Sequence, residues 1–145
     1  MTEQPVKKIH FVSCVKGKLS QPAPARQLYQ SLWFNSARTL LENKKADWFI
    51  LSAHHGLVEP EQVIAPYDVT LKTMTSQARK LWAAQTAQAI TARLDPQLIV
   101  LLAGKDYRQF LIPLLTERGF TFELPLAHLG IGSQIKQMQL AVRGV

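Results

Sequence analysis

One short segment of this sequence concentrates side chains that can do chemistry near neutral pH. His54 and His55 follow Ser52 at the end of an apolar run, and Tyr67 and Asp68 come later, after two prolines. A histidine changes charge near neutral pH, so it can donate a hydrogen bond or act as a general acid. A carboxylate among basic side chains stays ionised and can orient water or stabilise a developing cation. We therefore predict Asp68 and His55 as the catalytic residues.

Each of these residues also has an ordinary structural alternative. Either histidine can be a packing or hydrogen-bonding residue, and Asp68 can cap a turn. Adjacent side chains on an extended backbone point to opposite sides, so His54 and His55 do not suit a shared metal ion. The chain has one cysteine, Cys14, which excludes a zinc cluster built from cysteines. We expect no metal and no cofactor, and we expect Cys14 to be a packing residue that catalysis does not need.

The charge of the chain points to an anionic partner. The formal net charge is +7 and the pI is about 9.8. Such a basic excess favours nucleic acid, nucleotides or a membrane surface, although a protein can be basic without any of these partners. Basic and hydroxyl side chains at strand ends and at a helix start suit phosphate, and tyrosines suit base stacking. The predicted nucleic-acid or phosphate-binding residues are Ser13, Lys16, Lys18, Arg26, Ser52, Tyr67, Lys105, Tyr107 and Arg108.

The elements that must position these residues alternate regularly along the chain. Apolar runs predict strands at 9–15, 48–51, 98–103 and 120–124, and helical periodicity predicts helices at 25–43, 75–94 and 105–118 and from 133 onward. The Ala- and Gln-rich helix at 75–94 has an imperfect apolar stripe, so we place it on the outside. The alternation predicts one α/β domain over residues 1–145. We expect a three-layer sandwich whose mostly parallel four-stranded sheet has helices on both faces.

The topology brings the polar segments together. Parallel strands joined by right-handed crossovers place every strand-to-helix loop at one edge of the sheet. The segments 13–16, 52–68 and 104–108 should therefore converge in space. A connection as long as 52–68 in a small domain is usually functional.

The sequence also indicates the cellular location of the protein. No apolar run approaches the roughly 20 residues that a membrane-spanning helix needs. The amino terminus lacks the apolar core of a signal peptide. We expect a cytoplasmic protein without a membrane partner, and we make no prediction of its oligomeric state.

Several motifs together resemble a known group of proteins. They are Val-Ser-Cys-x-Lys-x-Lys at 12–18, Pro-Ala-x-Ala-Arg-x-Leu-Tyr at 22–29, Leu-Ser-Ala-x-His-Gly-Leu-Val at 51–58 and Ile-x-Pro-Tyr-Asp at 64–68. Leu-Ala-Gly-x-x-Tyr-Arg at 102–108 and Leu-Gly-Ile-Gly-x-Gln at 129–134 complete the pattern. The pattern is similar to a family of small uncharacterised bacterial and phage-associated domains. More distantly it resembles YaaA, a peroxide-stress protein that binds DNA, and a domain of archaeosine synthase.

The resemblance implies a nucleic-acid or nucleobase partner. Some members of the wider group are base-excising DNA glycosylases in phage defence, so the resemblance also implies an activity. The positions that match the family pattern are Ser13, Cys14, Lys16, Arg26, Tyr29, Ser52, His55, Gly56, Tyr67, Asp68, Tyr107 and Arg108.

Residues and resemblance together lead to one hypothesis and two alternatives. The hypothesis is an enzyme that cleaves an N-glycosidic bond, with DNA as a substrate in preference to RNA, or with a nucleotide. Asp68 would stabilise the sugar cation or orient water, His55 would hydrogen-bond the leaving base, and Tyr67 or Tyr107 would stack on it. The alternatives are a non-catalytic DNA-binding module related to stress or phage defence, and a nucleotide-binding regulatory domain.

Overall fold

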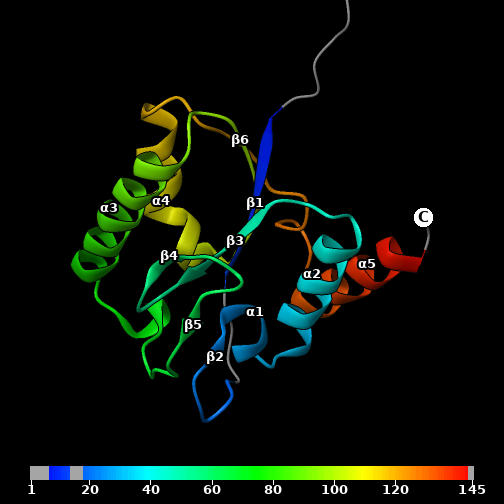
Figure 1. Ribbon diagram of the computed structural model, residues 1–145. Helices are drawn as coiled ribbons and strands as arrows, with labels where there is room; N and C mark the ends of the chain where they lie inside the picture. The colour runs from blue at the N-terminus through cyan, green and yellow to red at the C-terminus, as the bar shows by residue number, and fades with distance from the viewer. Residues whose placement is uncertain (1–6, 14–17, 144–145) are drawn as a thin grey trace, which may run out of the picture.

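A mixed sheet of five strands forms the centre of the protein, in the order β4-β3-β1-β6-β7 (Figure 1). The computed structural model describes residues 7–13 and 18–143. Strands β1 (Lys8–Ser13), β3 (Trp48–Ser52), β6 (Leu98–Leu102) and β7 (Thr121–Glu123) are parallel, whereas β4 (Gly56–Val58) runs antiparallel to β3. The predicted α/β class is confirmed.

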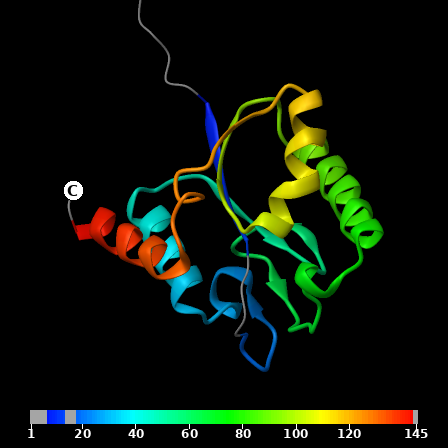
Figure 2. The ribbon, with the colours of Figure 1, turned by 180° about the vertical axis from the view of Figure 1, so that it is seen from behind.

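Helices connect the strands and cover the sheet. They are α1 (Ala25–Leu28), α2 (Leu32–Asn43), α3 (Ser76–Arg93), α4 (Lys105–Glu117) and α5 (Ile131–Arg143), with a 3-10 turn, η1, at Leu71–Thr73. Figure 2, seen from behind, shows α3 and α4 on one side of the sheet and α2 and α5 on the other. A small antiparallel sheet joins β2 (Ala23–Pro24) to β5 (Val63–Ile64).

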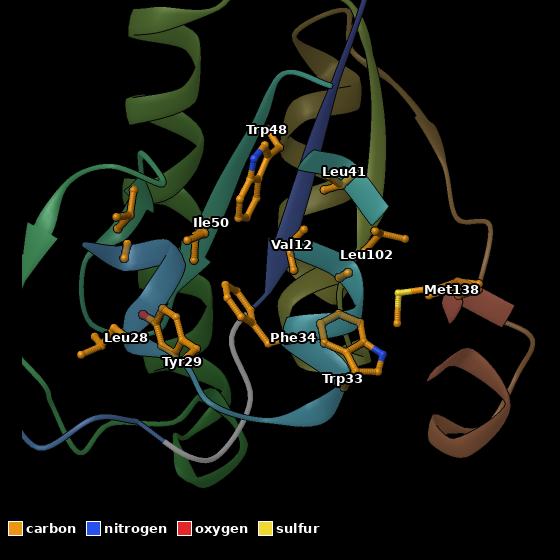
Figure 3. Close-up of a cluster of buried hydrophobic side chains, with 14 of the residues drawn as sticks. Val12, Leu28, Tyr29, Trp33, Phe34, Leu41, Trp48, Ile50, Leu102 and Met138 are labelled. Atoms are coloured by element: carbon orange, nitrogen blue, oxygen red, sulfur yellow. The ribbon is translucent and has the colours of Figure 1, made fainter. Parts of the chain in front are cut away.

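The alternation of side chains along the strands divides the core into two clusters. Val12, Ile50 and Leu102 lie in register across the sheet and pack against α2 and α5, as Figure 3 shows with Phe34 and Met138. Phe11 and Leu101 face the other way, toward α3 and α4. Because successive side chains of a strand point to opposite faces, one apolar run supplies both clusters.

The structure corrects two of the expected elements. The sheet has five strands instead of four, because residues 56–58 of the long connection return as β4. The single helix expected over 25–43 is two helices, since Ser31 caps a new helix by accepting a hydrogen bond from the Phe34 amide at 3.1 Å. Helix α3 lies on the outside as expected, and its own Trp82, Ala83 and Ile90 form the face that is buried.

Within the described part of the chain, no helix combines the length and the apolar character needed to cross a bilayer.

Candidate functional site at the carboxyl edge of the sheet

The side chain of Ser52 organises the carboxyl edge of the sheet. Ser52 is the last residue of β3 and is fully buried. Its Oγ accepts hydrogen bonds from the backbone amides of His54, at 3.3 Å, and His55, at 3.0 Å. The same Oγ donates to the hydroxyl of Tyr67 at 2.8 Å. One serine therefore fixes the turn that carries both histidines and also holds the tyrosine of the long connection.

Aromatic and basic side chains surround the ring of Tyr67. His54 stacks on it, with ring centroids 5.3 Å apart and planes at 27°, and His55 meets it edge-on at 5.4 Å. The ammonium of Lys18 lies 4.5 Å from the centre of the ring, within the range of a cation–π interaction. The Tyr67 hydroxyl also lies 2.7 Å from that of Tyr29. We call the set Lys18, Tyr29, Ser52, His54, His55 and Tyr67 the Tyr67 cluster.

Helices α3 and α4 are joined to the Tyr67 cluster through an indole ring. Trp82 of α3 donates from Nε1 to the Ser52 carbonyl at 2.9 Å. The same indole packs edge-on against Tyr107 of α4, with centroids 5.4 Å apart. Tyr67 and Tyr107 each pack against both core clusters, so they cover the edge of the sheet where its two faces meet. Ser52, Tyr67 and Tyr107, from the segments expected to converge after β3 and β6, lie close together at this edge with Lys18, whereas residues 14–16 of the first expected segment lie outside the described residues.

A guanidinium group fixes the later part of the long connection. Arg79 of α3 donates from Nε to the Leu71 carbonyl at 2.7 Å and from Nη2 to the Lys72 carbonyl at 2.8 Å. Its Nη1 lies 3.4 Å from Asp106 in the first turn of α4. Arg79 therefore holds η1 and the start of α4 in fixed positions beside the site.

The environment of His55 keeps its ring neutral. Desolvation and the nearby charge of His54 lower the pKa of His55 from its usual 6.5, against the opposing effect of a hydrogen bond with the Ala65 backbone. A neutral imidazole carries one N–H donor and one acceptor nitrogen. His55 is thus suited to hydrogen bonding at neutral pH and poorly suited to acting as a general acid.

Asp68 lies beside the Tyr67 cluster but is not bonded to it. Its side chain is exposed, and it makes no hydrogen bond or ion pair with the described residues. The alternative role as a turn cap finds no support in these contacts. Within the described ranges, no side chain binds this carboxylate.

The remaining predicted site residues lie at different places, and only some of them are at the carboxyl edge of the sheet. Ser13 is buried at the end of β1, and Lys105 is exposed at the start of α4. Arg108 lies in the first turn of α4, where its Nε is buried and has no hydrogen-bond partner within the described ranges. Arg26 pairs with Glu42 of α2 at 3.8 Å and, among the described residues, makes no cation–π contact with the Tyr67 ring. Lys16, like Cys14, lies outside the described residues.

The sequence assigns no role to two residues of the site, Tyr29 and Trp82. Tyr29 matches a family motif, but only the fold brings its hydroxyl to Tyr67. Trp82 lies in a helix that the sequence places on the outside. A tryptophan in an otherwise Ala- and Gln-rich helix is the signal that could have revealed its buried contact.

Comparison with known proteins places the chain in a family. Residues 9–140 match the model of a family of unknown function, DUF6884. The chain belongs to this family. It is also similar to an uncharacterised protein, YfjM, of Bacillus subtilis (strain 168), with 25% identity over 150 aligned positions that cover 94% of this chain and 96% of the relative.

Charge is distributed unequally between the two edges of this DUF6884 domain. Loops and helix ends at the opposite edge, including the hollow beside Trp48, carry six acidic residues (Glu42, Asp47, Glu59, Glu61, Asp95 and Glu117) and six basic residues (Lys7, Lys8, Lys44, Lys45, Arg93 and Arg118), so their formal charges cancel. At the carboxyl edge, Asp106 is paired with Arg79, and Lys18, Lys105 and Arg108 have no carboxylate partner among the described residues. An anionic ligand is therefore attracted to the edge that holds the Tyr67 cluster.

The described residues of the DUF6884 domain supply ring faces, hydrogen-bond donors and one carboxylate at this edge. Across 7–13 and 18–143, no group of three or more His, Cys, Asp or Glu residues is arranged to hold a metal ion. The arrangement can bind phosphate through its cations, contact a flat heterocycle through its rings and place Asp68 near a developing positive charge.

Proposed function

We propose that the protein binds nucleic acid, DNA in preference to RNA, and hydrolyses an N-glycosidic bond at the carboxyl edge of a three-layer sandwich. One observation carries the proposal. Lys18, His54 and His55 gather on Tyr67, next to the carboxylate of Asp68, which has no bonding partner among the described residues. Phosphate, base and sugar each find a suitable partner there. The distant resemblance to YaaA and to a domain of archaeosine synthase supports the same class of partner, and we expect the protein to act in the cytoplasm.

The chemistry assigns each residue a role. Hydrolysis breaks the bond between C1′ of the sugar and the base nitrogen, adds the hydroxyl of water to C1′ and leaves a proton on the base. Asp68 opposes the positive charge that develops on the sugar and orients the water. His55, kept neutral, donates a hydrogen bond to the departing base. In duplex DNA the base has to leave the stack first.

The test is base release by the wild type and by the Asp68→Asn variant, measured by mass spectrometry at equal occupancy of modified and unmodified DNA. Deleting the charge should slow release about 10²–10³-fold, since single electrostatic contacts to a transition state have effects of this size. Folding and DNA binding should persist, because Asp68 is exposed and has no bond to any residue within 7–13 and 18–143. The matched control is Asp95→Asn, which removes an exposed carboxylate from the opposite edge and should leave the rate unchanged.

Equal rates for Asp68→Asn and wild type would mean that Asp68 is a surface turn residue. A specific observation favours a second candidate, a non-catalytic DNA-binding module. Asp68 is exposed, and two hollows of the described surface, beside Trp48 and between α2 and α5, contain neither Asp68 nor His55. If the wild type binds DNA tightly but releases no base from any substrate, the second candidate replaces the first.

A further inference from the structure

We propose that the outer face of His54 is the surface on which an unpaired nucleobase stacks. This inference rests on the proposed function, because it names the part of the site that contacts the base. It differs from the expectation for Tyr67 and Tyr107, which were predicted to stack on the base themselves.

Both tyrosines are already engaged by the protein. The ring of Tyr67 contacts Lys18, His54 and His55, and its hydroxyl is bonded to Ser52 and Tyr29. The ring of Tyr107 packs on Trp82 and on both core clusters. A base could reach either ring face only by displacing side chains that hold the edge of the sheet together.

His54 meets the requirements of a stacking surface. Its side chain is exposed, although its ring lies on Tyr67 at 5.3 Å and 27°. Because one face of the ring rests on Tyr67, the accessible face is the one turned away from it. The backbone is fixed by the hydrogen bond from the His54 amide to Ser52, and His55 meets the ring edge-on at 4.6 Å. The ring is therefore held in place before a ligand arrives, which lowers the entropic cost of binding.

The surroundings indicate which ligand extends this stack. Every nucleobase has a flat π-face, so stacking alone does not select a sequence. Lys18, within 4.5 Å of the Tyr67 centroid, places a cation at the cluster, where it can meet a backbone phosphate. A base can reach a ring at the protein surface only when it is unpaired, so the ligand is single-stranded DNA or a flipped nucleotide.

The experiment compares two single-stranded probes of equal length, an oligothymidylate and an abasic oligodeoxyribose phosphate, in direct titrations at low salt. The probes carry the same phosphates, so the ratio of their dissociation constants isolates the contribution of the bases. His54→Ala should weaken binding of the oligothymidylate roughly five- to a hundredfold and leave binding of the abasic probe unchanged. His54→Phe, which keeps a flat ring, should retain the preference for bases. Lys18→Ala is the contrasting variant and should weaken the binding of both probes by a similar factor.

A second measurement does not depend on any variant. Stacking of thymine should shift the ring protons of His54 upfield in the NMR spectrum of the wild type, and the abasic probe should not. The inference is overturned if His54→Ala distinguishes the probes as strongly as the wild type, or if the His54 signals do not respond to oligothymidylate. Failure of the wild type to bind either probe would instead refute the proposed function.

Discussion

The hydroxyl group of Ser52 shows how a single residue shapes this site. A buried polar group is costly unless its hydrogen bonds are satisfied, and Ser52 satisfies its own by bonding two amides and a phenol. Those bonds set the positions of His54, His55 and Tyr67 before any ligand is present. A residue without charge thus places the groups that carry the proposed chemistry.

At the same scale, the lowered pKa of His55 gives a prediction. In His54→Ala the pKa of His55 should rise, because the variant removes both the nearby positive charge and part of the desolvation. Titration of the two proteins by NMR, following the His55 ring protons, measures the change. An unchanged or lower pKa in the variant would show that His54 does not act on His55.

The lowered pKa of His55 also determines how the free energy of unfolding changes with pH. The folded-state pKa of His55 lies below the unfolded value of 6.5, so the unfolded chain binds the proton more readily as pH falls. His55 therefore lowers the free energy of unfolding as pH decreases through about 6.5 toward the folded-state pKa.

At the scale of elements, the β3–β4 hairpin depends on one backbone conformation. Gly56 follows the two histidines and has φ +73°, in the left-handed region that side chains rarely adopt. A Cβ at this position would also lie 3.3 Å from Oγ1 of Thr86 in α3. The turn therefore needs glycine both for its conformation and for the close approach of the helix.

Gly56→Ala should lower the free energy of unfolding by about 1–2 kcal/mol, the usual cost of a side chain in this region. Chemical denaturation measures the change. The matched control is Gly132→Ala in α5, where an added Cβ meets nothing within 4 Å and alanine favours the helix. If both variants are as stable as the wild type, the turn does not require glycine.

At the scale of the whole molecule, the proposed binding of DNA depends on the unequal net charge of the two edges of the sheet. The net charge of +7 is not spread evenly, because acidic and basic residues balance at the edge away from the Tyr67 cluster, whereas Lys18, Lys105 and Arg108 have no carboxylate partner among the described residues. A polyanion is therefore drawn to the carboxyl edge, and it releases counterions when basic side chains neutralise its phosphates.

DNA affinity should consequently fall steeply with salt. With four phosphates neutralised, the dissociation constant for duplex DNA should rise roughly a hundredfold between 50 and 200 mM salt. Titrations at several salt concentrations give the slope. Affinity that is independent of salt in this range would remove the electrostatic part of the proposal.

The sequence by itself determined the fold class and predicted which polar loops share one edge of the sheet. Apolar runs bounded by turn residues predict the strands at 48–51 and 98–103, since burial on both faces of a sheet demands such runs. The caps of helix 76–93, at Thr75, and of α4, at Gly119, could be read from residue type, because capping is local chemistry. The crossover rule then placed the polar loops at one edge.

Only the tertiary structure decided how those loops are bonded. Strand β4 and the break at Ser31 could not be predicted, because β4 has only three residues and the apolar stripe of 25–43 continues across Ser31. Tyr29 and Trp82 belong to the site only because packing brings their polar atoms to Tyr67 and Ser52. Packing also pairs Arg26 with Glu42. It places one face of the exposed His54 ring on Tyr67. Residue types state what chemistry is possible, whereas long-range packing decides which groups are free to perform it.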